Sequence, residues 1–181
     1  NLTEENIYVL DSPILTNSQF KKFKKFFSKK VKIIDCTFDI QGSLKERIEL
    51  IREEAETAVR EGSTCLILSD KNISNQKASI PSILTVGAIH SHLVNHGLRG
   101  YCSLNVECSD AMDTHSFAIL IGVGATTVNP YLAIDSIYQR FEKKLFGKSD
   151  FETCVSKFKK SIDAGLLKIM SKMGISVISS Y

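Results

Sequence analysis

The chain has 181 residues and a formal net charge of +3, with 43% hydrophobic and 24% charged residues. This is ordinary globular composition, and a chain of this length can bury a core without disulfides or metal ions. The charge is too small to indicate a nucleic-acid or membrane surface by itself. No apolar run reaches the roughly 18 to 20 residues that span a bilayer.

In chain order, the first elements are an extended stretch at 10–15 and an amphipathic helix at 17–30. Apolar, β-branched runs then predict strands at 31–39, 63–70, 101–107 and 125–130. Helical periodicity predicts helices at 43–62, 79–97, 113–124, 131–147 and 150–174. Repeated strand–helix units predict an α/β fold. The expected architecture is a parallel sheet flanked by helices, either an open sheet or a partial barrel, with a helical C-terminal extension.

The cysteines indicate a reducing compartment. There are five, with no CxxC pair, at Cys36, Cys65, Cys102, Cys108 and Cys154. An odd number without a knotted spacing predicts reduced thiols. The gap between Cys102 and Cys108 could suit an iron–sulfur cluster, but a third nearby thiolate is missing, so buried core thiols are expected.

The lysine-rich stretch Lys21–Lys30 is the densest charge run. Lysines interleaved with aromatic residues could bind nucleic acid. The aromatic residues repeat at helical spacing, however, at Phe20, Phe23, Phe26 and Phe27. We therefore expect these phenylalanines on a buried face and the lysines on a solvated one.

The histidines gather at His90, His92 and His96, with His115 further on. The i, i+4 pair His92 and His96 could share a helix face as metal ligands do, but no cysteine or carboxylate near them in sequence completes a set. The nearest carboxylates in the sequence are Glu107 and Asp113. Structural or interface histidines are therefore expected in place of a metal site.

The glycine-containing stretch Gly122–Pro130 begins G-x-G but lacks a third glycine, and it follows a helix and precedes a strand. This order is the reverse of the dinucleotide-binding fingerprint, so a helix C-cap is expected. Ser91 is adjacent to His90 and His92 in the sequence. Adjacency alone does not predict the geometry of a catalytic triad. The residues alone therefore predict no catalytic, cofactor-binding or metal-binding residue in this chain.

Several stretches, taken together and in order, resemble the large chain of glutamate synthase. They are LDSPIL at 10–15, IDCTFD at 34–39, LILSD at 66–70, PSILTVGAIHSHLVNHGLR at 81–99, VE at 106–107, NPYLA at 129–133 and GLLKIMSKMGIS at 165–176. The resemblance covers essentially the whole chain. It departs at Ser116 and Val123, where the family has a histidine and an aromatic residue, so any interface role of His115 and of Gly122–Gly124 stays open.

The resemblance implies a division of the chain. Residues 1–150 correspond to the later portion of the central α/β domain. Residues 151–181 correspond to a helical linker and the start of the FMN-binding synthase domain. The chain begins on Asn1 and ends in an apolar segment, so both ends are interpreted as cuts in a longer polypeptide. Residues 175–178 are expected to be a barrel's first strand without its partner, and therefore either poorly anchored or packed in a makeshift way.

The resemblance also implies a function. The family makes two glutamates from glutamine, 2-oxoglutarate and two electrons, using FMN and an iron–sulfur cluster that lie outside this chain. The implied partners are the glutaminase and FMN-synthase domains of the same polypeptide, with ferredoxin or a nicotinamide-nucleotide-oxidising subunit as electron donor. No nucleic acid or membrane is implied, and the implied location is the cytoplasm or plastid stroma. This segment would connect the two sites and be inactive alone.

Two other hypotheses come from different classes. One is a stand-alone α/β binding module with a metal or phosphate site near His90, His92 and His96. The other is a nucleic-acid binder acting through Lys21–Lys30.

Overall fold

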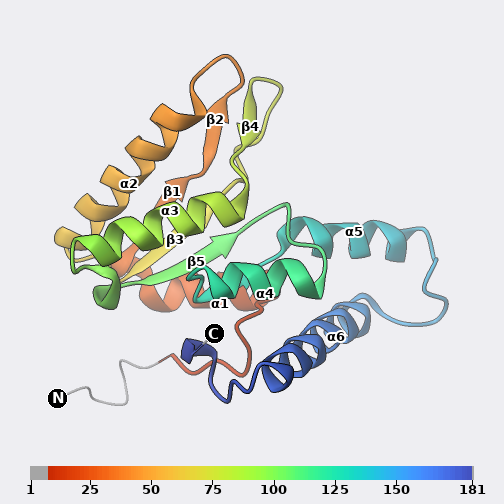
Figure 1. Ribbon diagram of the computed structural model, residues 1–181. Helices are drawn as coiled ribbons and strands as arrows, with labels where there is room; N and C mark the ends of the chain where they lie inside the picture. The colour runs from red at the N-terminus through yellow and green to blue at the C-terminus, as the bar shows by residue number, and fades with distance from the viewer. Residues whose placement is uncertain (1–7, 181) are drawn as a thin grey trace.

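The computed structural model describes residues 8–180, apart from the side chain of Ser179, and its core is a four-stranded parallel sheet (Figure 1). Neighbouring strands follow the order β1-β3-β5-β6. Their bounds are β1 Val31–Asp35, β3 Cys65–Ser69, β5 Ser103–Glu107 and β6 Thr127–Asn129. All three pairings are parallel. Because β1 and β6 are the edges of this order, the sheet is open, which settles the choice between an open sheet and a partial barrel.

The helices connect and follow these strands. The α-helices are α1 Asn17–Phe27, α2 Leu44–Arg60, α3 Ser82–Asn95, α4 Thr114–Gly122, α5 Tyr131–Glu142 and α6 Phe151–Lys172. Short 3-10 turns are η2 Ser28–Lys30, η3 Arg99–Tyr101 and η4 Ile178–Ser180. The predicted α/β fold with a long C-terminal helix is confirmed.

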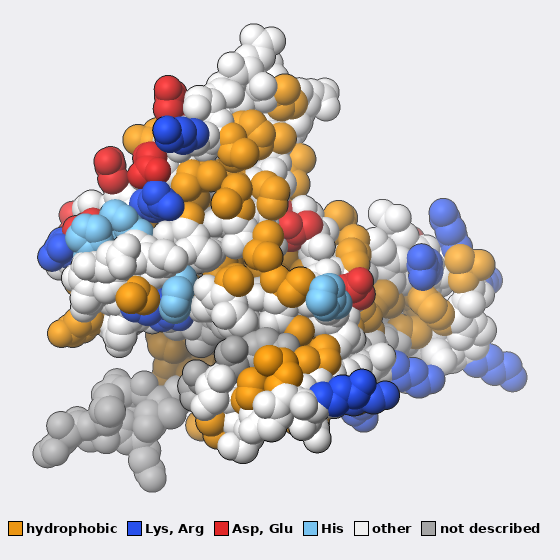
Figure 2. Space-filling model, viewed as in Figure 1, with side chains coloured by type: hydrophobic (Ala, Val, Ile, Leu, Met, Phe, Trp, Pro, Cys, Tyr) orange, Lys and Arg blue, Asp and Glu red, His pale blue; other side chains and the backbone are white. Residues whose placement is uncertain are grey.

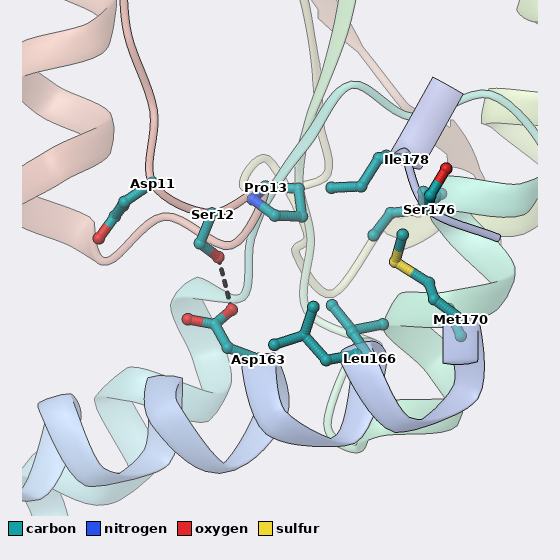
Figure 3. A pocket seen from close by; sticks show the side chains of 11 residues that line it. Asp11, Ser12, Pro13, Asp163, Leu166, Met170, Ser176 and Ile178 are labelled. Carbon is teal, nitrogen blue, oxygen red and sulfur yellow. Dashed lines mark hydrogen bonds between the residues drawn. The ribbon is translucent and has the colours of Figure 1, made fainter. Parts of the chain in front are cut away.

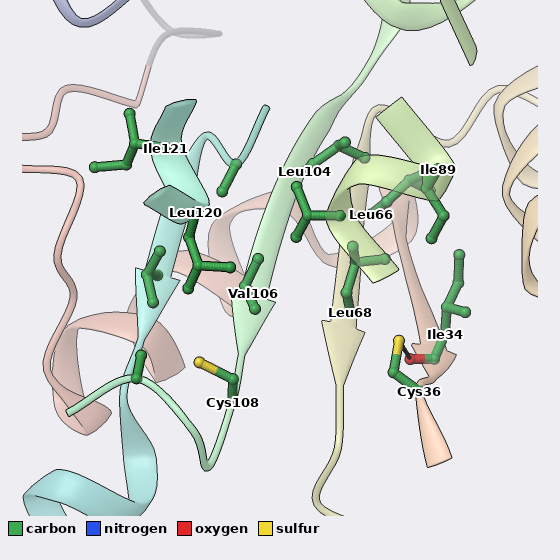
Figure 4. Close-up of a cluster of buried hydrophobic side chains, with 14 of the residues drawn as sticks. Ile34, Cys36, Leu66, Leu68, Ile89, Leu104, Val106, Cys108, Leu120 and Ile121 are labelled. Atoms are coloured by element: carbon green, nitrogen blue, oxygen red, sulfur yellow. Dashed lines mark hydrogen bonds between the residues drawn. The ribbon is translucent and has the colours of Figure 1, made fainter. Parts of the chain in front are cut away.

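The main core lies between the sheet and α2, α3 and α4 (Figure 4). Alternate strand residues point to this face, among them Leu66, Leu68, Leu104 and Val106, all at most 2% exposed. Each α/β crossover therefore places its helix on the same side of the sheet. The helices also pack on one another in sequence order, α2 on α3 and α3 on α4.

The opposite face is covered by α1, whose Phe20 and Phe23 pack on Cys65 and Ile67 of β3. The helix begins with the reciprocal bonds of a capping box at Thr16. The expectation of four buried phenylalanines is partly wrong, because Phe26 is 44% exposed and packs against Tyr8, with ring centroids 4.9 Å apart. The sheet is narrow, so only one stripe of α1 reaches it.

The segment before α1 adds to the sheet. Ile14 bridges Val128 in the parallel sense, and Leu15 N donates to the Val128 carbonyl at 2.9 Å. Val128 N in turn donates to the Pro13 carbonyl at 2.8 Å. The chain's first described residues therefore lie beside its last strand.

The strand predicted at 31–39 is wrong in one respect, because it is broken at Cys36. β1 ends at Asp35, and β2 Thr37–Asp39 pairs antiparallel with β4 Lys77–Ser79. Asp35 Oδ1 accepts from Thr37 N and Oγ1, and Arg47 donates to the carbonyls of Asp35 and Thr37. These bonds turn the chain out of the large sheet at that point.

The C-terminal part consists of α5, a break and α6. α5 ends at Glu142, short of the predicted 147, and positive φ values at Lys144 and Gly147 mark the break. Asp150 caps the next helix by accepting from Thr153 N at 2.7 Å. In the part of the chain that the structure describes, residues 175–178 pair with no strand, as expected, but the strand expected there is wrong, because they form none and η4 begins at Ile178.

Candidate functional site

Polar residues gather where the parallel strands end. Ser69 and Asp70 end β3, Glu107 ends β5 and Asn129 ends β6, and all four are buried. Ligands of open α/β sheets usually bind at this carboxyl edge. The carboxyl edge of the sheet is therefore a candidate binding site.

Asp70 is the centre of this group and is 3% exposed. Its Oδ2 accepts from Ser79 Oγ at 2.9 Å and from Ser109 Oγ and N at 2.6 and 3.0 Å. Its Oδ1 accepts from the Tyr131 hydroxyl at 2.7 Å. Burial, and then the bond to Asp70, raise the pKa of Tyr131 far above its ordinary value. One carboxylate thus holds together the end of β4, the loop after β5 and the start of α5.

Glu107 is similarly engaged and is 5% exposed. Ser69 Oγ donates to its Oε1 at 2.7 Å. Lys71 and Lys24 place their ammonium groups 3.2 and 3.5 Å from Oε2. Lys71 also lies 5.1 Å from the Tyr131 ring centroid. The carboxylate therefore connects β5, the loop after β3, and α1.

The space beside these carboxylates is too small for a substrate. The cavity lined by Cys36, Asp70, Ser82 and Cys108 among others has a volume of about 10 Å³, close to the minimum for a single water molecule. Burial raises the pKa of Cys36 to about 12 and raises that of Cys108 further, so neither thiol is poised as a nucleophile. The hydrogen bonds at this edge are better suited to holding neighbouring segments of the chain together than to binding a small molecule.

An apolar hollow of about 280 Å³ lies between α6 and residues 11–13 of the segment before α1, which we call the first segment (Figure 3). Its walls are Asp11, Ser12, Pro13, Ala118, Ile121, Asp163, Leu166, Leu167, Met170, Ser176 and Ile178. The Ser12 hydroxyl donates to Asp163 Oδ1 at 2.5 Å across one end. Ser176 and Ile178 bring the C-terminal residues against the hollow, so this tail packs on α6 in place of forming a strand.

The four histidines lie in three places. His90 Nδ1 accepts from Arg99 Nε at 3.1 Å, while His92 and His96 lie with Glu56 of α2. His115 is exposed on α4. Sequence reasoning missed Glu56 because it precedes the histidines by more than thirty residues. The signal was the predicted packing of two consecutive helices on one face of a sheet.

The glycine stretch is a helix C-cap, as expected. Val123 N donates to Ile119 O, closing α4, and Gly124 follows with φ of 124°. A Cβ at Gly124 would lie 2.4 Å from His90 Nδ1. Arg99 Nη2 donates to the Gly124 carbonyl at 2.8 Å. This glycine therefore serves a close approach between α3 and the end of α4.

The lysine-rich helix α1 keeps most of its lysines on the solvated side, as expected. Lys24 is the exception, because it reaches Glu107 and lies 5.0 Å from the Phe20 ring centroid. Among the helices of residues 8–180, we find none with the length and apolarity needed to cross a membrane.

Comparison with known proteins connects these features to a family. The family described as glutamate synthase central domain matches residues 1–181. The chain is 47% identical over 182 residues to the glutamate synthase [NADPH] large chain of Azospirillum brasilense, covering 99% of this chain and 12% of that protein.

Two further relatives differ from each other in the electron donor that their names give. The Bacillus subtilis glutamate synthase [NADPH] large chain is 41% identical over 178 residues, covering 95% of this chain and 11% of its own length. The chloroplastic ferredoxin-dependent enzyme of rice is 39% identical over 187 residues, covering 95% and 12%. The chain thus spans about an eighth of these relatives. It belongs to the glutamate synthase central domain family.

Proposed function

We propose that this chain is a structural and coupling segment of a glutamate synthase large chain. It holds the glutaminase site and the synthase site in register, and performs no bond-making of its own. The observation that carries the proposal is the Asp70 carboxylate, whose hydrogen bonds join β4, the loop after β5 and α5 at the edge where a ligand would otherwise sit. Family membership replaces the hypothesis of a stand-alone module.

The contribution of such a segment is positional. The parent reaction would release ammonia from glutamine at one site and use it at another to form glutamate from 2-oxoglutarate. Two sites that exchange a small neutral molecule work efficiently only when their separation and orientation are fixed. A buried, fully bonded polar network supports that role because it resists local rearrangement.

The residues of this chain do not fit the parent's FMN or iron–sulfur cluster. The carbonyl of Gly124 is already bonded to Arg99, and the cavity at the carboxyl edge is far smaller than a flavin. Among residues 8–180, no three cysteines approach one another closely enough to share a metal. We therefore infer that both groups, and the ferredoxin or NADPH-dependent electron supply, belong to other parts of the polypeptide or its partners.

We further propose that α6 fixes the position of the synthase domain relative to the α/β core. The helix is separated from α5 by the break at 143–149. It is fixed to the first segment by Asp163 and by Lys159, whose ammonium lies 3.1 Å from Asp11 Oδ1. On this reading residues 1–150 form the domain body and residues 151–181 the linker and the start of the synthase domain.

The experiment uses a full-length glutamate synthase that contains this segment. Asp70→Asn should keep the flavin content and glutaminase turnover but lower the glutamate formed per glutamine consumed, because ammonia escapes. Asp39→Asn, at an exposed carboxylate in the β2 turn, is the matched control and should remain fully coupled. Flavin absorbance or glutaminase turnover by the isolated 181-residue chain would refute the proposal.

A further inference from the structure

Glu56, His92 and His96 form a three-residue group that bridges two helices. Glu56 lies in the last turns of α2, and the two histidines lie at the end of α3. Glu56 Oε2 is 2.7 Å from His92 Nε2 and 3.7 Å from His96 Nε2. One ligand atom from each residue lies within 4.8 Å of the other two. In Figure 2, histidine side chains lie with acidic and basic ones where α2 and α3 end.

A hydrogen bond at Nδ1 orients the His96 ring so that its Nε2 lies toward Glu56, whereas His92 Nε2 already shares a hydrogen bond with Glu56 Oε2 at 2.7 Å. His96 Nδ1 is 2.7 Å from the His92 carbonyl, which can only accept, so Nδ1 carries the proton. In the neutral ring Nε2 is then unprotonated, and its lone pair faces Glu56 Oε2. The lone pairs of Nε2 and Oε2 can be shared by one cation, either a proton or a metal ion. A backbone carbonyl that orients the far nitrogen is also the usual outer support of a metal-binding histidine.

The Glu56 carboxylate is also held in a fixed orientation. Arg60 Nε donates to Glu56 Oε1 at 2.8 Å, which leaves Oε2 directed at the histidines. The rings of His92 and His96 lie 4.2 Å apart at their centroids, one helical turn from each other. All three side chains keep partial access to solvent, with 22%, 20% and 41% of Glu56, His92 and His96 exposed. An ion can therefore enter without unfolding.

We propose that Glu56, His92 and His96 bind one zinc ion, with water completing the coordination. Two imidazoles and a carboxylate are a donor set that favours Zn²⁺ or Ni²⁺ over Mg²⁺ and Ca²⁺. Zinc bonds of about 2.0–2.1 Å would set tetrahedral ligand atoms about 3.3 Å apart. The two separations from Glu56 Oε2, 2.7 and 3.7 Å, bracket that value. The ion would clamp α2 to α3.

The test measures zinc binding by calorimetry on the 181-residue chain and on a full-length large chain that contains it. Wild type should bind one more Zn²⁺ than His96→Ala, or bind it at least about tenfold more tightly. Glu56→Gln should weaken binding in the same way. His115→Ala removes an exposed histidine outside the group and is the matched control, which should change nothing.

Cobalt distinguishes this group from the cysteines. Co²⁺ bound here should give a visible spectrum that lacks the near-ultraviolet charge-transfer band of a thiolate ligand, and Cys154→Ser should leave it unchanged. Zinc should also raise the thermal midpoint of wild type but not of His96→Ala. The proposal is overturned if zinc affinity is the same in wild type and His96→Ala, or if Cys154→Ser abolishes the binding.

Discussion

Gly165 of α6 lies directly against Thr114 at the start of α4. A Cβ built on Gly165 would stand 2.6 Å from Thr114 Cγ2 and 2.7 Å from its Oγ1. Both branches of the threonine would clash, so no single shift of a flexible chain end relieves the contact. This glycine sets how closely the long C-terminal helix approaches the rest of the fold.

Gly165→Ala is therefore expected to destabilise the protein by about 1–3 kcal/mol, the usual cost of overpacking. Urea denaturation measures the effect. Gly87→Ala is the matched control, because Gly87 lies within α3 with no atom within 4 Å of a built Cβ. That change should be neutral or stabilising. Adding Thr114→Ala to Gly165→Ala should restore part of the loss, and an additive double variant would contradict the account.

Tyr131→Phe should lower the free energy of unfolding by about 1–3 kcal/mol, because buried Asp70 loses one of its hydrogen-bond donors. Tyr138→Phe provides the comparison. Tyr138 is 46% exposed and donates to Glu142 at 2.8 Å, so its hydroxyl is replaceable by water. Urea denaturation measures the free energy of unfolding of both variants. Equal losses in the two would show that the hydrogen bond to buried Asp70 contributes no more than an exposed one.

The stability of the protein should fall as the pH falls below about 6.5. Burial, followed by the Arg99 guanidinium, lowers the pKa of His90 below its ordinary 6.5. The unfolded chain therefore takes up a proton first, and the stability gained from neutral His90 is present above pH 6.5 and lost as the pH falls through the folded pKa.

Urea midpoints between pH 5 and pH 7.5 measure this dependence. His90→Gln should flatten the slope in that range, whereas His115→Gln should not, since His115 is exposed. Carboxylates with lowered pKa values, such as Asp113 and Asp150, act at more acidic pH. A slope that survives His90→Gln unchanged would assign the effect to another group.

The thiols should divide into two classes in a labelling experiment. Burial raises the pKa of Cys36 to about 12 and of Cys65 to about 11, and it raises that of Cys108 as well. These three should react with a disulfide reagent only on global unfolding, while the partly accessible Cys102 and Cys154 react in the native state. Fast labelling of Cys65, read by mass spectrometry, would contradict the packing of α1 on the sheet.

Much of the fold followed from local signals. The helical periodicity at 43–62 predicted a helix that the structure has at Leu44–Arg60, with the Ser43 side chain as its N-cap. The buried run at 63–70 likewise became β3. The departure at Cys36 was not predictable in this way. It depends on Arg47, one helix further on, reaching back to two carbonyls, and on a short pairing with β4 across more than thirty residues.

The polar residues at the carboxyl edge of the sheet were likewise predictable only in part. Asp70 and Glu107 were visible at the ends of predicted strands, and the parallel sheet places such ends together. Their partners were not visible, because Ser79 ends the short strand β4, Ser109 lies in a loop and Tyr131 begins α5, and only the packed fold brings these places together. Glu56 was missed for a related reason: helix packing brings it to His92.

The bridge between Ile14 and Val128 has a consequence for the order of folding. Ile14 is synthesised more than a hundred residues before Val128, so it cannot take its place beside that strand until those later residues have been made. Ser12 waits longer still, for Asp163, 151 residues on. Contacts so distant in sequence form slowly, because a long loop must close before they contribute. During synthesis the strand–helix units can assemble one after another, and the first segment seals the domain last.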